Sequence, residues 1–147
     1  MSLKNTIDAD LKTAMKARDE LVRDTLRMIK SELMNREIEL GKDLDESEEI
    51  GVLSRGVKSR KDSISEYEAG GRPEAADKER AEIAIIERYL PTPLTDVELR
   101  AIIAAVATEV GATSKRDMGK VMKVLGERYK GRYDGKAASK LIGETLP

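Results

Sequence analysis

Apolar residues recur along the chain three or four positions apart, which is the spacing of amphipathic helices. In the C-terminal stretch, Met118, Val121, Met122 and Leu125 fall at i, i+3, i+4 and i+7, so that one helix face is apolar. The same periodicity runs through the segments 3–15, 22–33, 50–67, 76–90, 102–110 and 137–146. No segment alternates strictly between apolar and polar residues, as a half-buried strand does. The sequence therefore predicts an all-α fold.

Capping residues and helix breakers set the expected helix boundaries. A side-chain oxygen at a helix start accepts a hydrogen bond from the free N–H groups of the first turn. Residues suited to this role are Ser2, Asp19, Asp45, Thr95, either Thr113 or Ser114, and Asp134. Pro73 suits the first position of a helix, and glycines at 41, 70–71, 111 and 131 suit helix ends.

The segment Pro91-Thr92-Pro93 interrupts the helical pattern, because proline disfavours helical geometry in the residue before it. We therefore predict a four-helix N-terminal domain over residues 1–90 and a small three-helix C-terminal domain over residues 95–147. The connecting residues 91–94 are expected to form a stiff, extended hinge.

The composition removes several classes of chemistry. The 147 residues contain neither cysteine nor histidine, so the chain lacks the commonest general base, the commonest metal ligand and any thiolate. There is no phosphate-binding glycine loop, and Gly70-Gly71 is expected to be a turn. We predict no cofactor and no metal, and no catalytic residue can be named.

Two further features bear on location. No apolar run approaches the roughly 20 residues of a membrane span. The first twenty residues include four acidic side chains, which is untypical of a targeting segment. We expect a cytoplasmic protein without a membrane partner.

The charge of the chain is distributed unevenly, although the formal net charge is only −1. Residues 1–94 hold 17 Lys and Arg against 21 Asp and Glu, whereas residues 95–147 hold 10 against 7. From Ala112 onward the count is 9 against 4. The cationic character is therefore concentrated near the C-terminus, where RNA phosphates are an expected ligand.

The candidate RNA-binding residues lie in this cationic stretch. The predicted phosphate contacts are Lys120, Lys123, Lys130, Arg132, Lys136 and Lys140. Tyr133 is a candidate for stacking on a base. Gly119 and Gly126 share a helix face and would permit close approach of an RNA backbone or a neighbouring helix. The alternative is that Tyr129 packs in the core and the lysines only keep the surface soluble.

Charged residues in the N-terminal half favour a structural interpretation. Glu79 and Glu82 share a helix face and could act as an acid–base pair if buried, but a solvated, salt-bridged face is the preferred interpretation. Arg60 belongs to a set of basic turns that could hold a phosphate, and here a charged surface is preferred. Glu32 and Arg36 are expected to pair at i, i+4.

The C-terminal stretch resembles the corresponding motif of the YqeY family. The residues that carry the resemblance are Met118, Gly119, Val121, Met122, Tyr129, Gly131, Asp134, Gly135 and Leu141, with the upstream segments 57–63 and 89–91. This family resembles the tail domain of GatB, a subunit of the glutamine-dependent Asp/Glu-tRNA amidotransferase. The resemblance implies a helical domain that helps to contact tRNA. The amidase segment and the ATP-handling domain of that complex have no counterpart here.

We therefore expect a non-catalytic, tRNA-associated accessory protein that binds structured RNA through its basic C-terminal domain. The first alternative is a helical module that binds a protein partner, which an exposed apolar patch on the C-terminal domain would favour. The second is an amidotransferase-linked carbon–nitrogen ligase activity with glutamine as amido-nitrogen donor. It would require an enclosed pocket with converging polar groups.

Overall fold

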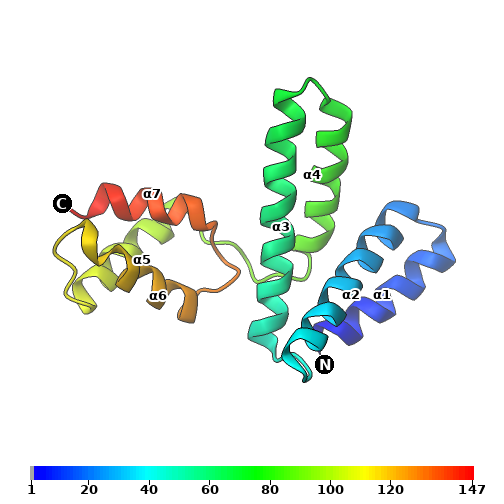
Figure 1. The fold of residues 1–147 in the computed structure, drawn as a ribbon, viewed down its shortest axis with the longest axis horizontal. Helices are drawn as coiled ribbons and strands as arrows, with labels where there is room; N and C mark the ends of the chain where they lie inside the picture. Colours follow the sequence, from blue (N-terminus) through cyan, green and yellow to red (C-terminus); the bar gives the residue numbers. More distant parts are fainter. Residues whose placement is uncertain (1) are drawn as a thin grey trace. The chain divides into compact units, whose positions relative to one another are not determined.

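The computed structural model describes residues 2–147, and within them every regular element is helical, which confirms the all-α prediction (Figure 1). The elements are α1 (Leu3–Ala17), α2 (Glu20–Leu40), α3 (Glu46–Ala69), α4 (Pro73–Glu87), α5 (Asp96–Glu109), the 3₁₀ helix η1 (Lys115–Asp117), α6 (Met118–Arg128) and α7 (Gly135–Thr145).

The predicted capping residues begin the helices as expected. The side chains of Ser2, Asp19, Asp45, Thr95 and Asp134 each accept a hydrogen bond from a backbone N–H in the following turn. Ser114 caps η1, and the side chain of Asp117 completes the capping box. The helix at Met118 is therefore entered through a 3₁₀ turn, which the sequence pattern did not predict.

The described residues divide into two compact units, one that ends at Leu90 and contains α1–α4, and one over residues 91–147 that contains α5–α7. We call them the N-terminal unit and the C-terminal unit. Each has its own hydrophobic core.

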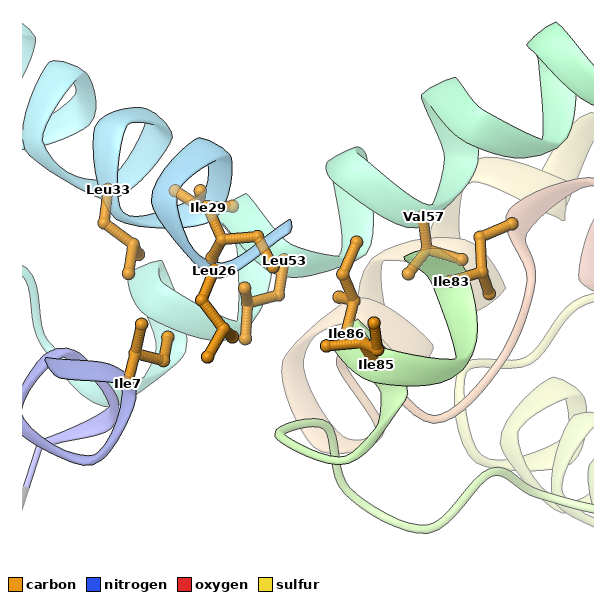
Figure 2. Packing of buried hydrophobic residues seen from close by; sticks show 10 residues of the cluster. Ile7, Leu26, Ile29, Leu33, Leu53, Val57, Ile83, Ile85 and Ile86 are labelled. Carbon is orange, nitrogen blue, oxygen red and sulfur yellow. The ribbon is translucent and has the colours of Figure 1, made fainter. Parts of the chain in front are cut away.

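In the N-terminal unit, α1 lies antiparallel to α2, and α3 lies antiparallel to α4 (Figure 1). Aliphatic side chains from all four helices fill the core between these pairs (Figure 2). Its centre includes Ile7 of α1, Leu26 of α2, Leu53 of α3 and Ile86 of α4, each of which is fully buried. Burying a side chain of this size contributes about 1.5–3 kcal/mol to folding.

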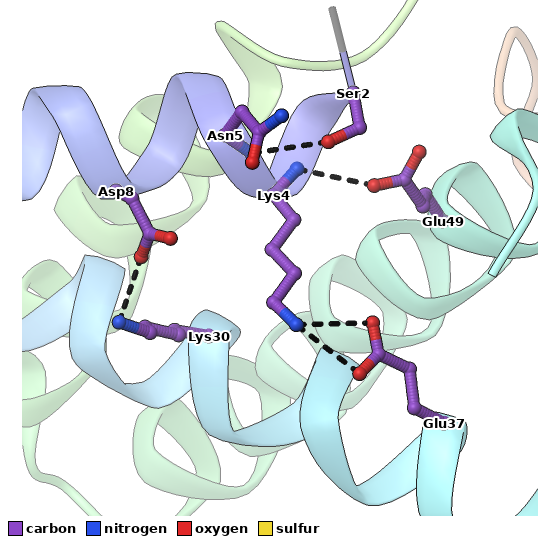
Figure 3. Close-up of polar contacts among 7 residues, drawn as sticks. All are labelled: Ser2, Lys4, Asn5, Asp8, Lys30, Glu37 and Glu49. Atoms are coloured by element: carbon purple, nitrogen blue, oxygen red, sulfur yellow. Dashed lines mark hydrogen bonds and ion pairs between the residues drawn. The ribbon is translucent and has the colours of Figure 1, made fainter. Parts of the chain in front are cut away.

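Polar side chains connect the first half of α1 to α2 and α3 (Figure 3). The backbone N–H of Lys4 donates to Oε2 of buried Glu49 over 3.1 Å, so a side chain from α3 satisfies a free donor in the first turn of α1. The Lys4 ammonium pairs with Glu37 of α2, and Lys30 pairs with Asp8 at 2.7 Å.

In the C-terminal unit, three short helices surround an entirely aliphatic centre. Ile103 of α5, Val121 and Leu125 of α6, and Ile142 of α7 are fully buried there. The residues of the predicted hinge are held to this unit, because Leu94 N–H donates to the carbonyl oxygen of Arg132 over 2.7 Å. The stiffness of the hinge remains a prediction.

Candidate nucleic-acid interface

Helix α6 presents two of the predicted phosphate contacts on its outer face. Val121 and Leu125 point into the core, while Lys120 and Lys123 are exposed. This separation follows from the helical period, because the lysines lie about half a turn away from the apolar stripe. Lys120 also pairs with Asp117 at 3.4 Å, whereas Lys123 makes no ion pair with any residue that the structure describes.

Helix α7 repeats this arrangement. Ala138, Leu141 and Ile142 are buried, and Lys136 and Lys140 are exposed one turn apart. A spacing of four residues along a helix corresponds to a rise of about 6 Å, so the two ammonium groups can contact separate phosphates.

The connection between α6 and α7 carries the remaining candidates, and they differ in exposure. Lys130 is exposed, whereas Arg132 and Tyr133 are half-buried. The Nε–H of Arg132 donates to the carbonyl oxygen of Thr92 over 2.8 Å. The ring of Tyr133 packs against the core, and this burial raises the pKa of its hydroxyl. Both side chains therefore have a structural role beside the predicted one.

The two glycines of α6 have different surroundings. A Cβ atom added at Gly119 would meet nothing within 4 Å, so this face of the helix is open. At Gly126 the hydroxyl of Tyr133 would lie 3.8 Å away, in ordinary van der Waals contact. Gly119 thus leaves room for close approach from outside, while Gly126 faces the tyrosine of its own unit.

Other cations brace the C-terminal unit. Arg128 forms a bidentate pair with Glu109, with nitrogen–oxygen distances of 2.8 and 2.5 Å, which links α6 to α5. Arg100 pairs with Glu144 at 3.3 Å and links α5 to α7. The guanidinium of Arg128 holds the pKa of the Glu109 carboxyl below its ordinary value. Neither arginine is among the predicted phosphate contacts.

The N-terminal unit contains a buried ionic cluster that the sequence analysis missed. Arg60 is 8% exposed, and its Nε–H donates to Glu82, itself 6% exposed, over 3.1 Å. Its Nη1 donates to the carbonyl oxygen of Gly56 over 3.0 Å, and its Nη2 lies 3.9 Å from the sulfur of Met28. Glu79 lies at the edge, 4.0 Å from Nε of Arg60. We call this set the Arg60 cluster.

The expected solvated face at Glu82 and charged surface at Arg60 were therefore wrong. A signal was present, because Arg60 continues the spacing of Leu53, Val57 and Ile64 on the buried side of α3.

Glu32 lies beside the Arg60 cluster on α2 and is half-buried. The expected Glu32–Arg36 pair was wrong, because Arg36 instead donates to Glu39 over 2.8 Å. Burial raises the pKa of the Glu32 carboxyl, and the charge of Arg60 partly opposes that shift. Burial likewise raises the pKa of Glu79, assisted by the negative charge of Glu82.

An open groove of about 390 Å³ runs between α2 and α3 on the same side of the unit. Its walls are Glu32, Asn35, Arg36 and Glu39 of α2 and Val52, Arg55, Gly56 and Ser59 of α3. Over residues 2–147, no cluster of acidic side chains has the geometry of a metal site. None of the helices formed by these residues has the length and apolarity to cross a membrane.

The fold and the charged surfaces define a two-unit, all-helical protein with cationic helix faces in its second unit. The model of the family described as Yqey-like protein matches residues 4–146, and the chain belongs to this family.

Curated relatives bear the name "Altered inheritance of mitochondria protein 41, mitochondrial". The protein from Lachancea thermotolerans is 38% identical over 104 residues, which cover 69% of this chain and 56% of the relative. The protein from Saccharomyces cerevisiae is 31% identical over 128 residues, which cover 82% of this chain and 67% of the relative. The chain thus spans between about half and two thirds of these relatives, whose name places them in mitochondria. The cytoplasmic location expected for this chain stays a prediction.

Proposed function

We propose that the C-terminal unit binds structured RNA, with tRNA as the leading candidate, through contacts between its lysines and phosphates. In this proposal, the three-helix unit acts as a separate binding domain and the protein serves a non-catalytic, accessory role.

The observation that carries this proposal is the placement of five lysines on the surface of the C-terminal unit. Lys120 and Lys123 lie on the outer face of α6, Lys136 and Lys140 lie on that of α7, and Lys130 lies between the helices. Flexible, exposed ammonium groups contact phosphates without restricting the base sequence. Arg100 and Arg128 join helices of the unit through carboxylates, so the proposal does not include them.

The proposal is tested by the salt dependence of binding between the purified protein and total tRNA. Neutralising one phosphate releases counterions, so the log–log slope of affinity against salt is about −0.9 per contact for duplexes. Five contacts give a slope between about −4 and −5. The double variant Lys123→Ala/Lys140→Ala should bind more weakly and reduce the steepness of that slope by about two.

A charge-matched control uses two exposed lysines of α1, in the variant Lys12→Ala/Lys16→Ala. It changes the net charge equally but leaves the C-terminal unit intact, so its affinity and slope should match those of the wild type. If both double variants lose the same affinity, the loss reflects the overall charge of the protein and not a site on the C-terminal unit. Absence of binding at low salt would refute the proposal.

A second candidate function is a protein-interaction module, and the exposed apolar residues favour the N-terminal unit for it. Helix α2 exposes Leu21, Met28, Met34 and Ile38, the last with 77% of its surface accessible. In the described part of the C-terminal unit, Val97 is the one large exposed hydrophobic residue. If α2 binds a protein partner, chemical crosslinking should capture a complex with the wild type and with Val97→Lys. The same complex should be absent with Ile38→Lys. Identical crosslinking patterns would exclude α2 as the contact.

A further inference from the structure

We propose that the groove between α2 and α3 binds a small zwitterion of the α-amino-acid type, with its ammonium against Glu32 and its carboxylate against Arg55. This site belongs to the N-terminal unit and goes beyond the proposed RNA binding.

Beside the groove, two charged side chains pack closely against the backbone of Gly56. A Cβ atom at Gly56 would lie 3.3 Å from Oε2 of Glu32 and 3.3 Å from Nη1 of Arg60, closer than side chains normally pack. The Glu32 carboxylate and the Arg60 guanidinium therefore both lie against the backbone of Gly56, where a larger side chain would displace them. Gly56 lies inside helix α3, where glycine costs about 1 kcal/mol relative to alanine. Its absent side chain lets the Glu32 carboxylate lie against α3 at the wall of the groove.

The charges that line the groove leave one carboxylate and one guanidinium without an ion-pair partner. Arg36 and Glu39 neutralise each other at 2.8 Å. Glu32 and Arg55 form no ion pair within 4 Å with any residue in the described part of the chain. Glu32 is half-buried, so its carboxylate is poorly solvated, and a ligand ammonium would restore the lost interaction. A guanidinium such as that of Arg55 binds a carboxylate through two parallel hydrogen bonds.

Ligands of a single sign fit the groove less well. A phosphate or nucleotide would face the negative charge of Glu32, and a polyamine would face the positive charge of Arg55. The volume of about 390 Å³ lies near the lower end of the range for small-molecule sites, which is suited to an amino acid. Asn35 and Ser59 line the walls and can donate or accept additional hydrogen bonds.

The experiment is ligand-observed saturation-transfer NMR with the full-length protein and a mixture of the twenty L-amino acids. Any amino acid that receives saturation is then compared with its carboxamide, which lacks the carboxylate, and its N-acetyl derivative, which lacks the ammonium. We expect the zwitterion to bind and each derivative to lose about tenfold or more in affinity. Absence of transfer to every amino acid, or equal binding of a derivative, would overturn the proposal.

Variants locate the site. Glu32→Gln and Arg55→Gln should each weaken binding about tenfold or more, and Gly56→Ala should weaken it by displacing the Glu32 carboxylate. Lys58→Gln is the matched control, because Lys58 is exposed on the same helix outside the groove and should bind as the wild type does. Circular dichroism verifies that each variant is folded. Unchanged binding in both Glu32→Gln and Arg55→Gln would remove the groove as the site, whatever the outcome of the RNA experiment in the other unit.

Discussion

The two units place their charges differently. The N-terminal unit buries the charged side chains of Glu49, Arg60 and Glu82. In the C-terminal unit, every buried residue that the structure describes is apolar, and the ion pairs lie at the surface. A buried charge is stable only with partners of good geometry, because its desolvation is costly. The buried charges of the N-terminal unit therefore join its helices, whereas the charged side chains described in the C-terminal unit lie outside its apolar core.

The largest expected effect comes from breaking the Arg60 cluster. Arg60→Met leaves the buried carboxylate of Glu82 without its guanidinium, which should lower the unfolding free energy by about 3–5 kcal/mol. Urea denaturation at neutral pH measures the loss.

Two controls sharpen this result. Arg60→Met/Glu82→Met removes both charges and should recover most of the stability, because an apolar pair can replace a buried ion pair. Arg128→Met removes one partner of an exposed pair in the C-terminal unit and should have little effect. If Arg60→Met lowers the unfolding free energy no more than Arg128→Met does, the contrast between the two units is mistaken.

Disrupting the aliphatic core of the C-terminal unit should have an effect confined to that unit. Leu125 is fully buried, so Leu125→Ala should cost about 2–5 kcal/mol through lost contacts and a cavity. Amide hydrogen exchange followed by mass spectrometry should show faster exchange in α5–α7 and unchanged exchange in α1–α4. Parallel loss of protection in all seven helices would mean that the units unfold together.

A smaller effect is expected at Tyr133, where two roles compete. Because the ring is half-buried against the core, Tyr133→Ala should destabilise the C-terminal unit by about 1–2 kcal/mol, while Tyr133→Phe should leave it nearly unchanged. RNA affinity, measured where the variants are folded, should change little in either. A loss of about 1–3 kcal/mol in affinity for Tyr133→Ala, with unchanged helical content, would instead identify a base-stacking ring.

The helices could be predicted because their determinants are local. Ser2, Asp45 and Thr95 cap helices through residues three positions away, and the period of the apolar residues sets the buried faces. The outward direction of Lys123 and Lys140 follows from the same period.

The partners of Arg60 and Arg132 could not be predicted, because they lie far away in the sequence. Arg60 meets Glu82 from another helix, and Arg132 meets the carbonyl group of Thr92 forty positions earlier. Local spacing was also a poor guide to pairs within a helix, where Arg36 selects Glu39 over Glu32. The choice depends on the burial of Glu32 against α3, which is a tertiary property.

The smallest expected effect is a difference in pH dependence between the units. Glu79 has a pKa raised above its ordinary value of 4.5, first by burial and then by the charge of Glu82. Its folded form therefore binds a proton more readily than its unfolded form, so acidification from neutral pH towards 4.5 should remove a destabilising contribution. Glu109 has a lowered pKa through Arg128, so its contribution is present above pH 4.5 and is lost only as the pH falls below it.

Isosteric amides separate these two contributions to the unfolding free energy. Glu79→Gln should raise stability at neutral pH and flatten its dependence on pH above about 4.5, since the amide carries no charge to desolvate. Glu109→Gln should lower stability slightly at neutral pH and reduce the loss seen on further acidification, since it removes a favourable pair. Urea denaturation across this pH range measures both. If Glu79→Gln instead lowers stability at neutral pH, its carboxylate is a net stabilising partner of Arg60, and the excess of negative charge in the cluster is already compensated.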